Sequence, residues 1–219
     1  MKIDAISDLH GSRPTLPGGD LLIIAGDMNA RDKLSEWVSF YHWLEKQNYR
    51  KKIYIAGNHD GFLTQYNTSS DPMWEKLNAD HTVEYLCDSL TEFEGLKIWG
   101  TPWSLSFDES NPHCRSFTGT EEELKAKYDL IPDDIDILIS HGPMKHMLDA
   151  NRDGYACGSY ELRNAVDRVK PKLLICGHIH EQGGKQMMYK HTGKNTWCVN
   201  ASYVDEHYKP VNRYMRMKI

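Results

Sequence analysis

Five short apolar runs in this chain each lead into a turn that combines a glycine with an imidazole, carboxylate or carboxamide side chain. The runs occupy residues 2–7, 20–25, 51–56, 135–140 and 172–176. Their length and β-branched composition predict buried strands. The turns that follow read DLHG (8–11), GD (26–27), GNHD (57–60), HG (141–142) and GHIH (177–180). In α/β sheets, ligands bind beyond the carboxyl ends of the strands, so we expect the five turns to meet at one sheet edge.

Longer amphipathic segments separate these strands. Residues 33–47 predict a helix whose apolar residues recur at helical spacing and form a core-facing stripe: Leu34, Trp37, Val38, Tyr41 and Leu44. Two further helices are predicted over 121–128 and 159–169, and a further strand over 96–100. After residue 180 the pattern indicates an antiparallel hairpin that turns near Gly193. The alternation of strands and helices predicts an α/β fold with an at least partly parallel sheet.

The composition fits a single folded domain that spans residues 1–219. The chain start lacks the apolar stretch of a signal peptide, and no run approaches the roughly 18 apolar residues of a membrane span. The five cysteines are scattered without a CxxC pair, which favours reduced thiols and a cytoplasmic location. The net charge is −5, and no long basic stripe is present, so we expect no stable binding of nucleic acid. The pattern does not predict an oligomeric state.

Each polar residue in the five turns has an ordinary interpretation, such as a turn aspartate or a surface histidine. Their recurrence after five separate strands favours a shared metal site instead. The donors are imidazole, carboxylate and amide oxygen without thiolate, a set that suits Mn, Fe, Zn or Ni better than calcium. Two ions bridged by one carboxylate, about 3.5–4 Å apart, would use all seven candidates and would suit phosphoryl chemistry. These candidates are Asp8, His10, Asp27, Asn58, His141, His178 and His180.

The motifs D-x-H, GD, GNHD, H and GHxH, in this order, resemble those of the calcineurin-like metallophosphoesterases. Other stretches are similar to the metallophosphoesterase-domain subgroup, which is like the class III cyclic nucleotide phosphodiesterases. These stretches are GTPW (100–103), SHGP (140–143), VKPKLLICGHIHEQGG (169–184) and VNAS (199–202). The resemblance implies a four-layer α/β/β/α sandwich with two mixed β-sheets.

The resemblance also implies how the candidates divide between two ions. Asp8, His10, Asp27 and His180 would hold one ion, and Asp27, Asn58, His141 and His178 the other, so that Asp27 bridges them. A hydroxide between the ions would attack phosphorus in line with the leaving oxygen. Manganese is the first candidate metal, with iron, zinc and nickel as alternatives.

Substrate contacts and proton transfer are assigned to residues near these ligands. His59, beside Asn58, is expected to contact a phosphate oxygen and to protonate the leaving alkoxide. Asp60 is expected either to orient His59 or to be an exposed turn residue. Three further residues could contact a phosphate or a nucleobase, or could equally serve as polar loop residues: Arg13, Asn29 and His113.

These expectations together favour a metal-dependent phosphodiesterase for cyclic nucleotides or similar small diesters. A nuclease of the same superfamily is an alternative, although the acidic charge balance argues against it. A phosphomonoesterase, including a phosphoprotein phosphatase, is a second alternative, but the arginine signature of those phosphatases is incomplete here. A non-catalytic metal-binding scaffold is a third, and the presence of all seven candidate ligands argues against it.

Overall fold

One side of the molecule is built on a five-stranded mixed sheet. The fold is taken from a computed structural model, which describes residues 1–66, 81–107 and 114–219. In this first sheet four strands are parallel and β13 is antiparallel to β1, in the order β13-β1-β2-β3-β4. The strands are β1 (Lys2–Ile6), β2 (Gly19–Ala25), β3 (Tyr49–Ile55), β4 (Val83–Tyr85) and β13 (Met215–Lys218).

A second, six-stranded mixed sheet has the order β11-β12-β10-β9-β6-β5. Its four central strands are parallel, and each edge strand is antiparallel to its neighbour. The strands are β5 (Ser89–Phe93), β6 (Leu96–Thr101), β9 (Ile137–Ser140), β10 (Leu173–Cys176), β11 (Gln186–Lys190) and β12 (Asn195–Asn200). The predicted hairpin is therefore confirmed as β11 and β12, and Gly193 lies in its turn with φ 81°.

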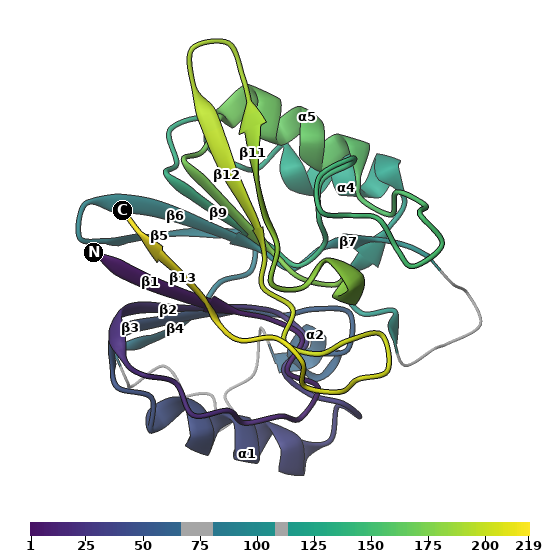
Figure 1. The fold of residues 1–219 in the computed structure, drawn as a ribbon. Helices are drawn as coiled ribbons and strands as arrows, with labels where there is room; N and C mark the ends of the chain where they lie inside the picture. The colour runs from purple at the N-terminus through teal and green to yellow at the C-terminus, as the bar shows by residue number, and fades with distance from the viewer. Residues whose placement is uncertain (67–80, 108–113) are drawn as a thin grey trace.

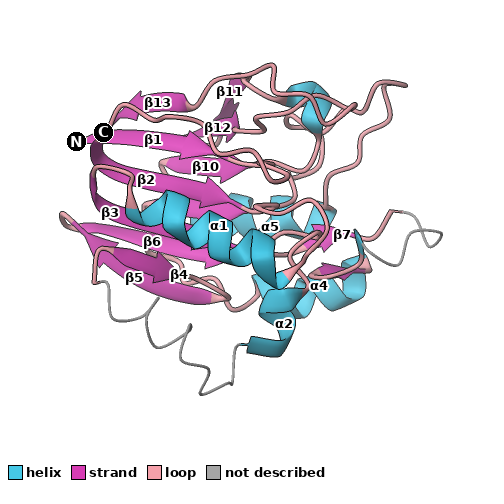
Figure 2. Ribbon diagram, turned by 90° about the horizontal axis from the view of Figure 1, so that it is seen from below, coloured by secondary structure: helices cyan, strands magenta, loops and turns pink. Residues whose placement is uncertain are grey.

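The two sheets pack face to face with helices on both outer faces (Figures 1 and 2). A continuous apolar core joins residues such as Ile23 and Ile55 of the first sheet to Ile139 and Ile175 of the second. Helix α1 (Leu34–Glu45) covers the first sheet, while α4 (Glu121–Tyr128) and α5 (Tyr160–Val169) cover the second. This confirms the expected four-layer α/β/β/α sandwich.

Short elements complete the described fold: α2 (Phe62–Tyr66), β7 (Ser104–Leu105), β8 (Thr118–Gly119) and the 3-10 turn His180–Gln182.

The predicted stripe of α1 is confirmed in part, since Trp37, Tyr41 and Leu44 are buried. Leu34 and Val38 are 55% and 38% exposed, whereas Phe40 and Trp43 are buried. The ring of Phe40 lies 5.7 Å from that of Tyr54 on β3, so this side of the helix faces the first sheet. The larger aromatic side chains bury more apolar surface than leucine or valine would at the same place, so they occupy the core face.

The five predicted strand ends do lie close together, but they belong to two sheets and not to one edge as the strand pattern alone suggested. β1, β2 and β3 come from the first sheet, and β9 and β10 from the second. Ser7 at the end of β1 forms a bridge with Ser202, which follows β12 of the second sheet. The carboxyl ends of both sheets therefore meet at one end of the sandwich. Within the described ranges, no helix is long and apolar enough to cross a membrane.

Candidate metal centre

The backbone of the turns after the strands is unusual at the predicted ligands themselves. Asp8, His10, Asp27 and His178 all have positive φ angles, of 52°, 40°, 53° and 67°. Such a conformation is uncommon for residues other than glycine and marks strain held by the surrounding structure. Four of the seven candidate ligands therefore share this uncommon conformation, although it also occurs at other places in the described chain.

The glycines of the motifs allow the loops to approach one another. A Cβ atom at Gly57 would collide with Oδ1 of Asp27, and one at Gly177 would collide with the side chains of Ser7 and Asp8. Neither glycine has a positive φ, so it is space and not backbone freedom that excludes a larger residue here. Close approach of β3 and β10 to the ligand loops thus depends on these two positions.

One group of donors gathers at the ends of β1 and β10. The Nε2 atoms of His10 and His180 lie 3.2 Å apart, and Nε2 of His180 lies 3.4 Å from Oδ1 of Asp8. These three side chains offer donor atoms that all lie within 4.8 Å of one another. The distances are compatible with one ion held between two imidazoles and a carboxylate.

A second group gathers around Asn58. Its Oδ1 lies 2.9 Å from Nε2 of His141 and 2.9 Å from Nδ1 of His178. The amide nitrogen of Asn58 donates instead to the carbonyl of Cys114, at 3.2 Å, which turns the oxygen toward the two imidazoles. Two imidazoles and one amide oxygen therefore face a common point.

Asp27 lies between these two groups. Its Oδ2 is 3.7 Å from Nε2 of His10 in the first group and 3.5 Å from Nε2 of His141 in the second. The side chain is buried, and its Oδ1 accepts the backbone N–H of His59 at 2.8 Å. The structure thus brings all seven candidate ligands together, with Asp27 in reach of both groups. The division of the ligands between two ions stays a prediction.

Outer hydrogen bonds orient several of these ligands. Nδ1 of His141 is 2.8 Å from the carbonyl oxygen of Ala25, and Nδ1 of His180 is 3.0 Å from that of Asp205. Donation from Nδ1 leaves Nε2 free to bind a cation. Asp8 is held by Ser202, whose hydroxyl donates to Oδ2 at 2.7 Å. Ser202 belongs to the VNAS stretch, whose sequence alone does not indicate this role.

Burial determines the protonation state of His10 and His178. It lowers the pKa of His10 to about 4 and that of His178 to about 3. The charge of the neighbouring His141 also lowers the pKa of His178. Both rings are therefore neutral at pH 7, which is the form that binds metals.

Charge pairing outweighs burial at the other groups. Burial would lower the pKa of His141, but Asp27 raises it to about 9. Burial would likewise raise the pKa of Asp27, but the charge of His141 and its hydrogen bond hold it well below its usual range. At Asp8, the hydrogen bond and charge of His180 lower the pKa in the same way. Both carboxylates are thus anionic at neutral pH despite complete burial.

The donor set itself fits a bound cation. When Nδ1 of His141 donates to Ala25, a neutral ring presents a lone pair to the oxygen of Asn58, so two acceptors face each other at 2.9 Å. Only a proton or a metal ion can stabilise such a pair. Without a metal ion, His141 itself carries this proton at neutral pH because its pKa is raised to about 9. A metal ion that binds between the two acceptors can replace the proton. The site therefore has the ligands and the charge that a two-metal centre requires.

His59 and Asp60 occupy different positions in the centre. The ring of His59 is 4.7 Å from that of His10 and lines the open cavity, and its donor atom lies within 4.8 Å of donor atoms of His10 and Asp27. Asp60 is buried, and its Oδ2 accepts backbone N–H groups from Gly57 at 2.9 Å and Met28 at 3.3 Å. It is therefore not an exposed turn residue, and these bonds tie together the loops that carry Asn58 and Asp27.

The placement of Arg13 and Asn29 speaks against the predicted contact with substrate. The guanidinium of Arg13 donates to Oδ1 of Asn29 and to the carbonyls of Ser12, Met28 and Glu36. Asn29 has no exposed surface. The guanidinium of Arg13 thus ties the loop after β2 to α1, while Nε of Arg13 and Nδ2 of Asn29 are buried without a hydrogen-bond partner among the described residues. His113 lies outside the described residues.

The candidate centre opens into a cavity of about 330 Å³. Besides candidate ligands, its lining includes residues that the motifs did not indicate. Phe107 and Tyr208 provide aromatic rings, and Glu181 and Glu206 provide carboxylates. Asn151 and Cys157 also line it. Glu181 directly follows the turn GHIH and lies in the 3-10 turn His180–Gln182. The other lining residues named here lie in loops away from the five turns and reach the centre only through the tertiary fold.

Fold and site together define a metal-dependent phosphoesterase, and comparison with known proteins supports this. The family described as calcineurin-like phosphoesterase matches residues 1–182. Metallophosphoesterase domain-containing protein 1 of Homo sapiens is 34% identical over 94% of this chain and 67% of its own length. A UPF0046 protein of Caenorhabditis elegans is 33% identical over 92% of this chain and 73% of its own.

A solved structure agrees at the level of the fold. The crystal structure of the protein TT1561 of Thermus thermophilus has a TM-score of 0.58 at 14% identity and covers 99% of this chain and 97% of its own. This likeness supports the sandwich architecture alone. On the sequence comparisons, the chain belongs to the calcineurin-like phosphoesterase family. Members of this family hydrolyse phosphoric esters at a dinuclear metal centre, and this chain carries the corresponding candidate ligands.

Proposed function

We propose that this protein is a phosphodiesterase that acts on small diesters such as cyclic nucleotides. The observation that carries the proposal is the charge of the cavity. Apart from the candidate metal ligands, its charged lining residues are Glu181 and Glu206, and no lysine or arginine belongs to the part of the lining that the structure describes. A diester carries one negative charge, which two metal ions can balance. A dianionic monoester or a polyanion would meet additional carboxylates without a cationic side chain to offset them.

The residues of the centre would have different roles in such a reaction. The seven candidate ligands would hold two transition-metal ions, with manganese as our first choice and iron, zinc or nickel as alternatives. When bound, the ions make a water molecule acidic near neutral pH and stabilise negative charge on the phosphoryl oxygens. Burial of Asp8 and Asp27 keeps competing water away from their carboxylates and strengthens their attraction for cations.

His59 is the candidate general acid. Its backbone N–H is fixed on Oδ1 of Asp27, and its ring packs edge-on against His10 while remaining in contact with the cavity. A proton delivered from this ring to the leaving alkoxide would lower the barrier by the usual contribution of general acid catalysis. Asn58 lies next to it and, besides its predicted role as a ligand, can contact the phosphate.

The expected partner is a small-molecule substrate. We propose no stable binding of nucleic acid and no association with a membrane. A cytoplasmic location is part of the proposal, and it rests on the scattered cysteines of the sequence, which form no CxxC pair.

A screen of metal-loaded protein tests the proposal. The substrates are cyclic nucleotides, nucleotide monoesters and short single- and double-stranded DNA, each at several salt concentrations. We expect the highest kcat/KM on a small diester, with weak salt dependence because few charges are involved. Faster cleavage of DNA with a steep salt slope would favour a nuclease, and faster hydrolysis of monoesters would favour a phosphomonoesterase. Absence of turnover on every ester, with both ions bound, would favour the scaffold alternative.

A further inference from the structure

Two large aromatic side chains stand beside the metal centre and remain exposed. Phe107 is 58% exposed and Tyr208 is 54% exposed, and both line the cavity. Neither belongs to a motif of the sequence. Exposed aromatic surface that borders a polar cavity is a common means of binding an apolar, planar part of a ligand.

Tyr208 lies over the imidazoles of the first donor group. Its ring centroid is 4.7 Å from that of His10, 5.5 Å from that of His180 and 6.3 Å from that of the candidate acid His59, with edge-to-face geometry in each case. The tyrosine is therefore adjacent both to candidate ligands and to the residue that would protonate a leaving oxygen. A group attached to the phosphate can reach it.

Hydrogen bonds within the loop that carries Tyr208 keep the ring in this position. Tyr208 itself has φ 60°, which is unfavourable for a residue with a Cβ atom. The conformation is maintained around Asp205, whose carbonyl accepts the N–H of Tyr208 at 2.9 Å and whose Oδ1 accepts the N–H groups of His207 and Lys209 at 2.9 and 2.8 Å. The same Asp205 carbonyl orients His180. Strain of this kind concentrates at functional sites.

Phe107 stands at the other donor group. Its ring centroid is 5.3 Å from that of His178, in edge-to-face geometry. Each aromatic side chain thus borders the imidazoles of a different group, and the phosphate of a diester would lie between them. Glu181 and Glu206 line the same cavity, so a substrate with further phosphate groups would be repelled.

We propose that Tyr208, assisted by Phe107, is a specificity residue that stacks on the nucleobase of a nucleoside diester with a single phosphate. This inference rests on the proposed phosphodiesterase function and narrows its substrate class. Stacking on an aromatic side chain accepts any base, since every base has a π face. We therefore expect a preference for diesters that carry a base over those that do not, and only weak discrimination among bases.

A binding experiment tests this inference independently of turnover. The probes are adenosine 5′-methylphosphonate and methyl methylphosphonate, two singly charged analogues that differ in the nucleoside. Their dissociation constants are measured by calorimetry on metal-loaded protein. Tyr208→Leu is expected to weaken binding of the adenosine analogue roughly 5- to 150-fold, the usual worth of one stacked base. The loss for the methyl analogue should be at least fivefold smaller. Phe107→Leu should act in the same direction.

Two further variants separate stacking from other effects. Tyr208→Phe retains the ring and should restore affinity for the adenosine analogue to within about twofold. Tyr160→Leu removes a tyrosine of similar exposure, 51%, that does not line the cavity, and it should change neither dissociation constant. Equal losses for both probes in Tyr208→Leu, or no preference for the adenosine analogue in the original protein, would overturn the inference.

The outcomes also distinguish this inference from the proposed function. If the adenosine analogue binds through Tyr208 but no diester is hydrolysed, the recognition site stands and the enzymatic proposal fails. If diesters are hydrolysed while Tyr208→Leu leaves the preference unchanged, the enzymatic proposal stands and the stacking role fails.

Discussion

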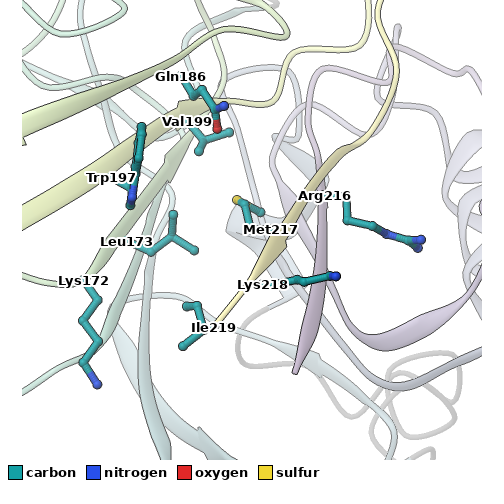
Figure 3. A pocket seen from close by; sticks show the side chains of 9 residues that line it. All are labelled: Lys172, Leu173, Gln186, Trp197, Val199, Arg216, Met217, Lys218 and Ile219. Atoms are coloured by element: carbon teal, nitrogen blue, oxygen red, sulfur yellow. The ribbon is translucent and has the colours of Figure 1, made fainter.

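Two of the cavities in the described structure are similar in size and very different in chemistry. The cavity at the metal centre has about 330 Å³, and a groove at the open edge of the sandwich has about 380 Å³. Figure 3 shows the edge groove, where β13 of the first sheet faces β10 and β12 of the second. It is lined by Lys172, Leu173, Gln186, Trp197, Val199, Arg216, Met217, Lys218 and Ile219.

The charges of the edge groove are largely used within the protein. Arg216 makes two hydrogen bonds of 2.7 Å to the carboxylate of Asp4, and Lys172 lies 2.9 Å from a carboxylate oxygen of Asp136. Most of the other lining residues have apolar side chains, and nearly all of these belong to strands. At the metal centre, by contrast, the polar groups come from the loops after the strands and point at one another.

Position relative to the strand ends, and not volume, therefore separates the two cavities. Within a strand, side chains alternate between faces and pack against a neighbouring layer. Beyond the carboxyl ends of parallel strands, several loops can direct polar side chains to one point. Substitutions at the two cavities should accordingly have very different effects.

The largest effect is expected for Asp27→Asn. The amide retains the shape of the side chain but removes the charge that both donor groups share, so both ions should bind more weakly. The loss of affinity should exceed the roughly 10–100-fold typical of losing an outer partner. Elemental analysis after dialysis measures the number of ions that stay bound. The exposed Asp153→Asn is the control. His10→Ala is expected to weaken the binding of mainly one ion. Retention of two tightly bound ions in Asp27→Asn would contradict the bridging prediction.

His59→Ala should lower kcat on a nucleotide diester by roughly 10²–10⁴-fold while both ions remain bound. The loss should be much smaller on a nitrophenyl diester, because nitrophenolate leaves without needing a proton. His42→Ala, in an exposed position of α1, is the matched control. Equal losses on both substrates would instead indicate that His59 positions the phosphate, and loss of an ion would make it a ligand.

Ser202→Ala removes the hydroxyl that donates to Oδ2 of Asp8. We expect metal affinity to fall by about 10–100-fold, as is typical when an outer hydrogen bond to a ligand is lost. Ser104→Ala is the control, since this buried serine has an Oγ without a hydrogen-bond partner in the described structure. Metal titration measures the affinity of each variant for the ions. Similar metal affinities in the two variants would mean that Ser202 has no role in orienting Asp8.

Metal binding should also depend on pH through His141. Asp27 raises the pKa of His141 to about 9, so the metal-free protein carries a proton there at pH 7 that an ion must displace. Apparent affinity should therefore rise with pH, by up to about tenfold per unit, until pH 9. Calorimetry in buffers of different ionisation enthalpy measures the released proton. Affinity that is constant between pH 6.5 and 8 would contradict the assignment of His141 as a ligand.

The smallest effect is expected at the edge groove. Trp197 is 46% exposed, and Trp197→Leu should lower the free energy of unfolding by less than about 1 kcal/mol. The variant should keep both metal affinity and kcat/KM within about twofold. A loss of activity without a loss of stability would show that the groove takes part in function and would break the contrast between the two cavities.

Much of the fold and most of the candidate centre could be predicted from the sequence. The apolar runs predicted β1, β2, β3, β6, β9 and β10, because their patterns depend on local burial alone. The turns after them indicated the seven candidate ligands, since each turn is local and its polar residues are adjacent in the chain. The short strands β4, β5 and β13 were not predicted, because exposed edge strands carry a weaker apolar pattern.

Tertiary structure decided which residues share a cavity. Arg13 follows a ligand turn in the sequence, yet its hydrogen bonds direct it into the loop behind the centre. Tyr208 lies far beyond His180 in the chain, yet its ring covers His180 and His10. A local pattern predicts secondary structure and the donor types at each strand end. The convergence of two sheets, and the loop that places Tyr208, depend on long-range packing that no short stretch encodes.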